Sequence, residues 1–193
     1  MRSKSLWTII IGLPAVAVAA TTILLLAEKE APKTMETQTN NRSSSLKLVS
    51  QVFRDGAAIP AQYTCRGQNV NPPLNIMGVP AGTKSLALIV HDPDAVSGDF
   101  VHWTAWDIPI ATTEVAANSV PTGTVQGINS AGRAGYMGPC TPAGTGTHHY
   151  IFELYALDKT LGLKNNTDRD QLKNAMEGHI LAQHILTGLF SAD

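Results

Sequence analysis

The sequence predicts a mostly antiparallel β domain with one late helix, preceded by a long apolar segment at the N-terminus. Three observations lead to this prediction. Residues 6–27 form an uncharged apolar run of 22 residues. The later part of the chain holds several short runs with the alternation, or the β-branched and aromatic enrichment, of strands. A last apolar pattern at three-to-four spacing is typical of an amphipathic helix.

The N-terminal run is long enough to cross a bilayer as a helix, because about 18 apolar residues suffice. It reads LWTIIIGLPAVAVAATTILLLA, and Arg2 and Lys4 before it would hold the N-terminus in the cytoplasm. A cleaved signal peptide is the alternative, with residues 17–19 (AVA) as a cleavage site. The run stays apolar well past that site, which favours an uncleaved signal anchor over residues 1–27.

Either interpretation sends the rest of the chain across the membrane. We expect a single-pass membrane protein with an extracytoplasmic C-terminal domain, or a periplasmic or secreted protein if the leader is cleaved. Residues 28–45 read EKEAPKTMETQTNNRSSS, with Met35 as the one large apolar side chain. Such a segment buries too little surface to offset its ordering entropy, so we expect a flexible linker. The domain is then residues 46–193.

Four segments of this domain have the pattern of strands. Residues 46–53 alternate apolar and polar side chains, and SLALIVH at 85–91 suits a buried strand. Residues 100–108 are rich in aromatic and β-branched side chains, and residues 150–157 again alternate. Turn residues such as NPP, PAG and DPD separate the runs.

Two further segments follow a different pattern. Residues 121–147 hold seven Gly and three Pro among 27 residues, and a loop this long inside a compact domain usually has a functional reason. The helix is expected to begin near residues 166–168, capped by Asn166 or Thr167. It would run to a break at Gly188. Its apolar positions would be Leu172, Met176, Ile180, Leu181, Ile185 and Leu189.

Charge and motifs exclude several functions. Residues 46–193 carry nine Lys or Arg against twelve Asp or Glu, a formal charge of −3, which argues against nucleic-acid binding. The sequence has no nucleophile elbow, phosphate loop or zinc-protease motif, and no tight metal-ligand spacing. We therefore predict no cofactor and no metal.

Polar residues recur where the predicted strands end. Asp92 follows one buried run, His102 opens the next, and His148 follows the Gly-rich loop. If these strands are neighbours, the three side chains converge on one site, where imidazole and backbone N–H groups can donate to a small anion. Each residue also has a plainer explanation, Asp92 as a turn residue and each histidine as a structural group. His149 would point to the opposite face from His148, because side chains alternate along a strand.

The order of the motifs resembles the phosphatidylethanolamine-binding protein family, in its bacterial branch of Raf-kinase-inhibitor-like proteins. The similarity covers about residues 47–190. The matching segments are 63–74 (YTCRGQNVNPPL), 91–95 (HDPDA), 102–103 (HW), 107–109 (DIP), 135–142 (GYMGPCTP), 148–157 (HHYIFELYAL) and 175–182 (AMEGHILA).

This resemblance implies an antiparallel β-sandwich with a small pocket for phosphate-like groups, including phospholipid head groups. The implied ligand-binding residues are Asp92, His102 and His148, with a wall from Gly138, Pro139 and Pro142 and support from Tyr150. Cys65 and Cys140 lie in matching motifs and could form a disulfide in an exported chain, but the sequence leaves their distance open.

Four positions depart from the family pattern. His149 stands where the family usually has Arg, so the positive charge beside the site is lost or becomes pH-dependent. Asp107 replaces a usual Asn, while Val96 and Thr141 replace usual prolines.

The sequence supports three functional hypotheses. The first is a membrane-tethered, non-enzymatic binding protein for a small phosphate-bearing or carboxylate ligand, with regulation of a protein partner as an output. The second is a hydrolase in which His102 or His148 acts as general base and Asp92 orients it, with water as the nucleophile. The third is a protease- or kinase-inhibitor-like protein that acts through surface loops.

Overall fold

The computed structural model describes residues 46–192. The predicted anchor or signal peptide at residues 1–27 and the linker at residues 28–45 lie outside the described residues. Within 46–192, no helix has both the length and the apolar character needed to span a membrane.

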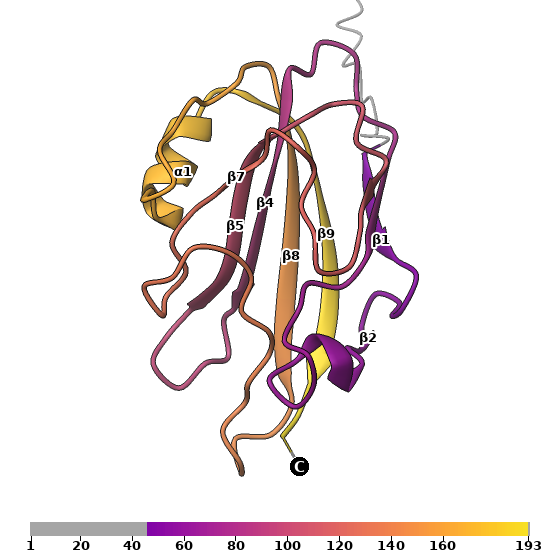
Figure 1. Ribbon diagram of the computed structural model, residues 1–193, viewed down its shortest axis with the longest axis vertical. Helices are drawn as coiled ribbons and strands as arrows, with labels where there is room; N and C mark the ends of the chain where they lie inside the picture. The colour runs from indigo at the N-terminus through magenta and orange to yellow at the C-terminus, as the bar shows by residue number, and fades with distance from the viewer. Residues whose placement is uncertain (1–45, 193) are drawn as a thin grey trace, which may run out of the picture. The chain divides into compact units, whose positions relative to one another are not determined.

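The described chain forms two sheets. A three-stranded sheet has the order β1-β3-β6, and a six-stranded sheet has the order β2-β9-β8-β4-β5-β7. Figure 1 shows the four long strands of the larger sheet side by side. The smaller sheet contains β1 (Lys47–Ser50), β3 (Leu74–Met77) and β6 (Glu114–Val115). The larger contains β2 (Ala57–Ala58), β4 (Ser85–Asp92), β5 (Phe100–Ile108), β7 (Val125–Gln126), β8 (His148–Leu157) and β9 (Ile180–Phe190).

The larger sheet is buried on both faces over its central strands. One face packs on the smaller sheet, where Leu48 and Leu74 meet Leu88 and Phe152 in the main core. The other face packs on the helix α1 (Arg169–Met176) in a second, smaller core. The second core joins Ala87, Ile89, Trp106, Tyr155, Leu157, Leu172 and Met176. This arrangement explains why residues 85–91 are apolar at nearly every position.

The predicted mostly-β fold with one helix is confirmed, and most strand bounds agree closely with the sequence pattern. All paired strands in residues 46–192 are antiparallel except β2 and β9, which pair in parallel at Ala57 and Ala58. The first predicted strand is shorter than expected, because it ends at Ser50 rather than at residue 53.

The predicted helix is wrong in its second half. The observed helix α1 begins at Arg169 and ends at Met176. Residues Ile180–Phe190, which were predicted to continue the helix, form β9 and pair with β8 along its length. The helix therefore is not the last element of the domain. Its N-cap is Asp168, which forms a reciprocal capping box with Gln171, rather than Asn166 or Thr167. Gly178, with φ of 75°, follows the helix end and was the stop signal that the apolar spacing obscured.

Gly188, which the sequence suggested as a helix break, lies inside β9. A Cβ on this residue would stand 2.4 Å from Cγ1 of Ile59 and 2.5 Å from its Cδ1. Glycine is required at this position because Ile59, buried in the main core, packs directly against the β9 backbone.

A disulfide between Cys65 and Cys140 joins two loops that are 75 residues apart, with a Cα–Cα distance of 5.3 Å. The pairing that the sequence left open is therefore present. The Cys65 N–H also donates to the carbonyl oxygen of Pro139, at 3.0 Å. Together these bonds hold residues 136–142 against the loop that contains the 3₁₀ turn Ala61–Tyr63.

Replacing both cysteines by serine should destabilise the domain without changing its fold. A cross-link that closes a loop of this length restricts the unfolded chain, which corresponds to about 4 kcal/mol of unfolding free energy in the chain-entropy account. Urea denaturation of the double variant and the parent chain measures this difference. Treatment of the parent with a reducing agent should lower its midpoint similarly, and an unchanged midpoint in both experiments would contradict the expectation.

Candidate ligand-binding site

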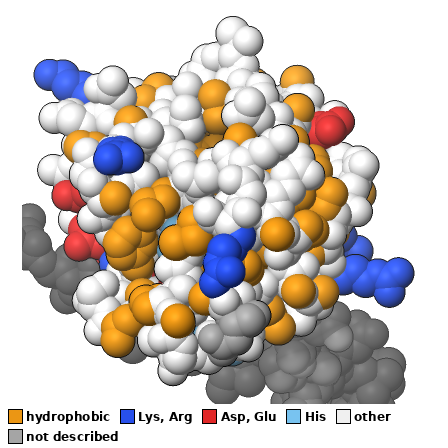
Figure 2. Space-filling model, turned by 60° about the horizontal axis from the view of Figure 1, so that its bottom comes forward, with side chains coloured by type: hydrophobic (Ala, Val, Ile, Leu, Met, Phe, Trp, Pro, Cys, Tyr) orange, Lys and Arg blue, Asp and Glu red, His pale blue; other side chains and the backbone are white. Residues whose placement is uncertain are grey.

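A cavity of about 200 Å³ opens where β4 ends and where β5 and β8 begin. Figure 2 brings this end of the domain forward and shows apolar side chains around a hollow in which a histidine is visible. The structure brings four of the predicted residues together in its lining. The lining residues are Asp92, Ala95, Val96, Ser97, Phe100, His102, Met137, Cys140, Pro142 and His148.

A β-bulge directs His102 toward this cavity. Val90 pairs with Trp103, but the next residue of β4, His91, pairs with Val101, so that His102 is the extra residue in β5. In a regular strand His102 and Trp103 would point to opposite faces of the sheet. The bulge lets Trp103 fill the main core while His102 lines the cavity beside it.

Asp92 and His148 form a buried pair at the base of the cavity. The Asp92 Oδ2 lies 2.7 Å from His148 Nδ1, and both side chains are at least 96% buried. The Asp94 N–H donates to the other carboxylate oxygen of Asp92 at 2.9 Å, which fixes the carboxylate. A buried carboxylate with two donors is stabilised as an acceptor, so we assign the proton of the pair to His148 Nδ1.

The second nitrogen of His148 contacts the Gly-rich loop. Its Nε2 lies 3.0 Å from Oγ1 of Thr145, and that hydroxyl lies 2.8 Å from the Pro142 carbonyl oxygen. When Nε2 carries a proton it donates to the Thr145 hydroxyl, which itself donates to the Pro142 carbonyl oxygen. The loop thereby covers a nitrogen that could otherwise face a ligand.

His102 has a different environment from His148. Its Nδ1 lies 2.7 Å from the Met137 carbonyl oxygen, and because a carbonyl only accepts, this nitrogen carries the proton. The rings of Phe100 and Tyr150 lie against the imidazole, with centroids 4.9 Å and 5.1 Å away. Burial lowers the pKa of His102 below the 6.5 of an exposed imidazole. At neutral pH, His102 is therefore neutral and its Nε2 is an acceptor.

Gly138, Pro139 and Tyr150 lie behind the cavity lining. Tyr150 is buried against His102, and burial raises the pKa of its hydroxyl to about 12, so it stays neutral. Gly138 and Pro139 are buried in the segment whose neighbours Met137 and Cys140 supply the wall.

Sequence reasoning missed six lining residues. They are Ala95, Val96, Ser97, Phe100, Met137 and Cys140. Four of them belong to the β4–β5 loop or to the start of β5, directly after the Asp92-Pro93-Asp94 motif. The Asp92-Pro93-Asp94 motif could have indicated that the loop after it lines the cavity. The sequence does not show which of the loop side chains point inward, because a loop has no repeating pattern.

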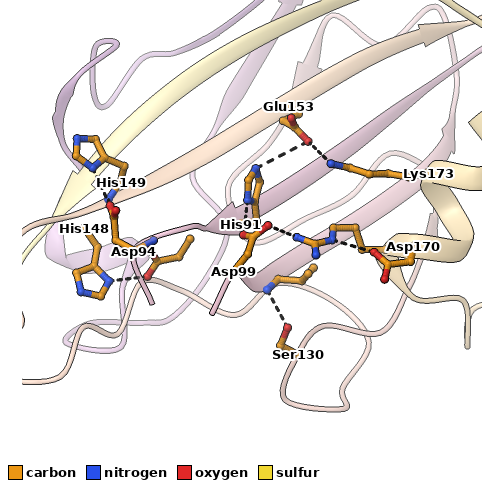
Figure 3. A network of polar contacts seen from close by, with 12 residues as sticks. His91, Asp94, Asp99, Ser130, His148, His149, Glu153, Asp170 and Lys173 are labelled. Atoms are coloured by element: carbon orange, nitrogen blue, oxygen red, sulfur yellow. Dashed lines mark hydrogen bonds and ion pairs between the residues drawn. The ribbon is translucent and has the colours of Figure 1, made fainter. Parts of the chain in front are cut away.

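His149 points away from the cavity and pairs with Asp94. Its Nδ1 and its backbone N–H both lie 2.8 Å from Asp94 Oδ2, and these hydrogen bonds lower the pKa of the carboxyl. Figure 3 shows this exposed pair beside the buried His148 pair, and a second network in which His91 contacts Asp99. His149 and Asp107, the two residues that differ from the family pattern in charge, therefore both have structural contacts. His149 pairs with Asp94, and the Asp107 carboxylate accepts from the backbone N–H groups of Leu161 and Gly162.

No three His, Cys, Asp or Glu side chains in residues 46–192 are grouped so that they could hold a metal ion.

A family model described as phosphatidylethanolamine-binding protein matches residues 49–191. The chain belongs to the phosphatidylethanolamine-binding protein family. The family predicted from the motifs is therefore confirmed.

Relatives of this chain are found in archaea and bacteria. The UPF0098 protein PH1269 of Pyrococcus horikoshii is 49% identical over 153 residues, which cover 76% of each chain. A Mycobacterium tuberculosis protein named as a candidate lipoprotein, LppC, is 46% identical over 145 residues, 75% of this chain and 72% of that one.

Two solved structures share the fold. A phosphatidylethanolamine-binding protein homologue, CT736 of Chlamydia trachomatis, is 38% identical with a TM-score of 0.74, over 78% of this chain and 100% of that chain. YbcL of Escherichia coli, described as a member of the mammalian family, is 30% identical with a TM-score of 0.73, over 77% and 99%. The described residues 46–192 of the present chain all lie in one compact unit.

The buried His102 should make the domain less stable in acid. Because its pKa in the folded state lies below 6.5, the unfolded chain takes up the proton first as the pH falls. The contribution to stability is complete above pH 6.5 and is lost as the pH falls toward the folded-state pKa. Thermal unfolding of His102→Gln, which keeps an N–H donor, should show a shallower loss of stability between pH 7 and pH 5 than the parent. Equal losses in the two proteins would contradict this assignment.

Proposed function

We propose that this protein is an exported, membrane-tethered binding protein whose cavity holds a small phosphate-bearing or carboxylate ligand, such as a phospholipid head group. The observation that carries the proposal is the buried Asp92–His148 pair beside His102, at the base of a small cavity. A volume near 200 Å³ suits a head group or a small ion rather than a drug-sized molecule.

Anion binding at this site depends on local donors, since residues 46–193 carry a formal charge of −3. The His148 Nε2–H is one such donor, available when a ligand oxygen replaces Thr145 Oγ1. His102 can donate from Nε2 only after it takes up a proton, because burial keeps it neutral at pH 7. Binding of an anion is therefore coupled to proton uptake and strengthens as the pH falls.

Three observations support export and tethering. Residues 6–27 have the length and flanking charges of a membrane anchor. A disulfide is typical of oxidising compartments outside the cytosol. The M. tuberculosis relative is named as a candidate lipoprotein, which is a membrane-attached class of protein. We propose that ligand binding in turn regulates a protein partner.

A hydrolase is the second candidate, favoured by the 2.7 Å contact between Asp92 and His148. A carboxylate that orients an imidazole is the arrangement of a general base. In this mechanism a water activated by His148 or His102 attacks an ester or phosphoester bound in the cavity.

Inorganic phosphate, phosphoethanolamine and sulfate should each raise the melting temperature of the domain of residues 41–193. At ten times the Kd, a bound ligand stabilises by about 1.4 kcal/mol, which is about 4 °C for a domain of this size. The shift should be larger at pH 5.5 than at pH 8 because His102 must be protonated. Sulfate keeps its charge between pH 5.5 and pH 8. A pH dependence of its binding therefore reports protonation of the protein and not of the ligand.

The His148→Ala variant should lose this shift, whereas His179→Ala, whose exposed side chain pairs with Asp158, should keep it. Absence of a shift in the parent at millimolar concentrations of all three anions would refute the binding function. Turnover of phosphoester substrates that His102→Ala abolishes would instead support the hydrolase.

A further inference from the structure

A second cavity of about 280 Å³ shares no lining residue with the first. One segment contributes to both cavities, because Tyr136 lines the second and Met137 lines the first. Four of the nine residues that line the second cavity carry side-chain amides, namely Asn69, Asn71, Asn118 and Gln126. None of the described residues that line it is an Asp, Glu, Lys, Arg or His.

The orientation of the key amides follows from groups that can only donate. The Gly138 N–H lies 2.7 Å from the Asn69 Oδ1, and the Trp103 indole N–H lies 2.8 Å from the Gln126 Oε1. Since a backbone or indole N–H cannot accept, both side chains must present their oxygen to these donors. Neither amide can be flipped without placing an NH₂ group against another donor.

The NH₂ groups of Asn69 and Gln126 are consequently left as donors. Neither has a hydrogen-bond acceptor within residues 46–192, apart from any solvent in the cavity. Asn71 is different, because its NH₂ donates to the carbonyl oxygens of Pro72 and Ala116 and its Oδ1 accepts from Ser119 N–H. The Tyr136 hydroxyl is also used, since it donates to the Tyr63 carbonyl oxygen.

Unused donors without a formal charge define the chemistry of a ligand. They favour an acceptor oxygen, and a neutral carbonyl suits them better than a carboxylate, whose desolvation no cation in the lining offsets. The rest of the lining comes from Asn118, Ser119 and Gly135 and from Val70, Val120 and the Tyr136 side chain, of which the last three suit a methyl group. A carbonyl that carries a methyl group is an acetyl group, and an amide carbonyl is a strong neutral acceptor, so the acetamido group fits both requirements.

We propose that this second cavity binds the acetamido group of a neutral ligand such as an N-acetylated amino sugar. The carbonyl oxygen accepts from Asn69 Nδ2 and Gln126 Nε2, while the methyl group packs on the aliphatic wall. The site is independent of the anion cavity and of the function proposed for it.

The experiment is a titration of the ¹⁵N-labelled domain of residues 41–193 with N-acetylglucosamine, followed by NMR. The side-chain NH₂ signals of Asn69 and Gln126 should shift together, with a Kd of about millimolar order for so small a ligand. Glucose, which lacks the acetamido group, and acetate, which carries a charge, should leave these signals in place. Shifts caused equally by glucose would overturn the acetamido assignment, and shifts caused by acetate alone would show a carboxylate site instead.

Two nearly isosteric variants test the donors without disturbing the fold. Gln126→Glu and Asn69→Asp each keep the oxygen that the Trp103 or Gly138 N–H requires, but replace the ligand-facing NH₂ with oxygen. Asp also tolerates the φ of 57° at residue 69. Each variant should bind N-acetylglucosamine at least about tenfold more weakly.

Gln68→Glu is the matched control, because it makes the same charge change one residue away, at a side chain outside the cavity lining. It should bind N-acetylglucosamine as the parent does. Unchanged affinity in Gln126→Glu and Asn69→Asp, with backbone spectra that show an intact fold, would overturn the proposal. The melting-temperature shift with sulfate measures the other cavity, so failure of one site is distinguishable from failure of the other.

Discussion

The pairing of β8 with β4 on one side and β9 on the other is the interaction on which the rest of the domain depends. This strand pairs with β9 from His148 to Leu157 and with β4 from Ile151 to Leu157. Its two faces contribute to different cores, with Phe152 and Leu154 against the smaller sheet and Tyr155 and Leu157 against α1. Because the first residue of the strand is His148, the same pairing that closes the core also brings that imidazole to Asp92 at the end of β4.

The candidate site combines two histidines whose environments differ for physical reasons. His148 lies against the Asp92 carboxylate, which also accepts from the Asp94 N–H, whereas His102 lies between aromatic rings and donates to a carbonyl. Burial lowers the pKa of His102 and favours its neutral form, while the His148 Nδ1 contacts the Asp92 carboxylate. A donor and an acceptor are thus placed in one small cavity, and the anion binding that we propose there would therefore depend on pH.

Residues 135–142 connect the two cavities and the disulfide. Tyr136 and Met137 face different cavities, Gly138 is held by Asn69, and Cys140 is bonded to Cys65. A Cβ on Gly138 would stand 2.6 Å from the Tyr63 carbonyl oxygen, so glycine is needed for the segment to lie this close to the neighbouring loop. The order of this segment therefore comes from contacts with distant parts of the chain rather than from a regular element.

The sequence by itself determined the family, the mostly-β class and the buried strands, because alternation, turn residues and ordered motifs are local properties. It also pointed to Asp92, His102, Pro142 and His148, which line one cavity. It could not determine that Ile180–Phe190 is a strand, since its apolar spacing continues that of α1 and only the unpaired edge of β8 selects the extended form. The bulge at His102, the disulfide and the orientation of the Asn69 and Gln126 amides were likewise decided by tertiary structure alone. Each of these depends on which donor, edge or side chain arrives from elsewhere in the chain, and such contacts leave no periodic trace in the sequence.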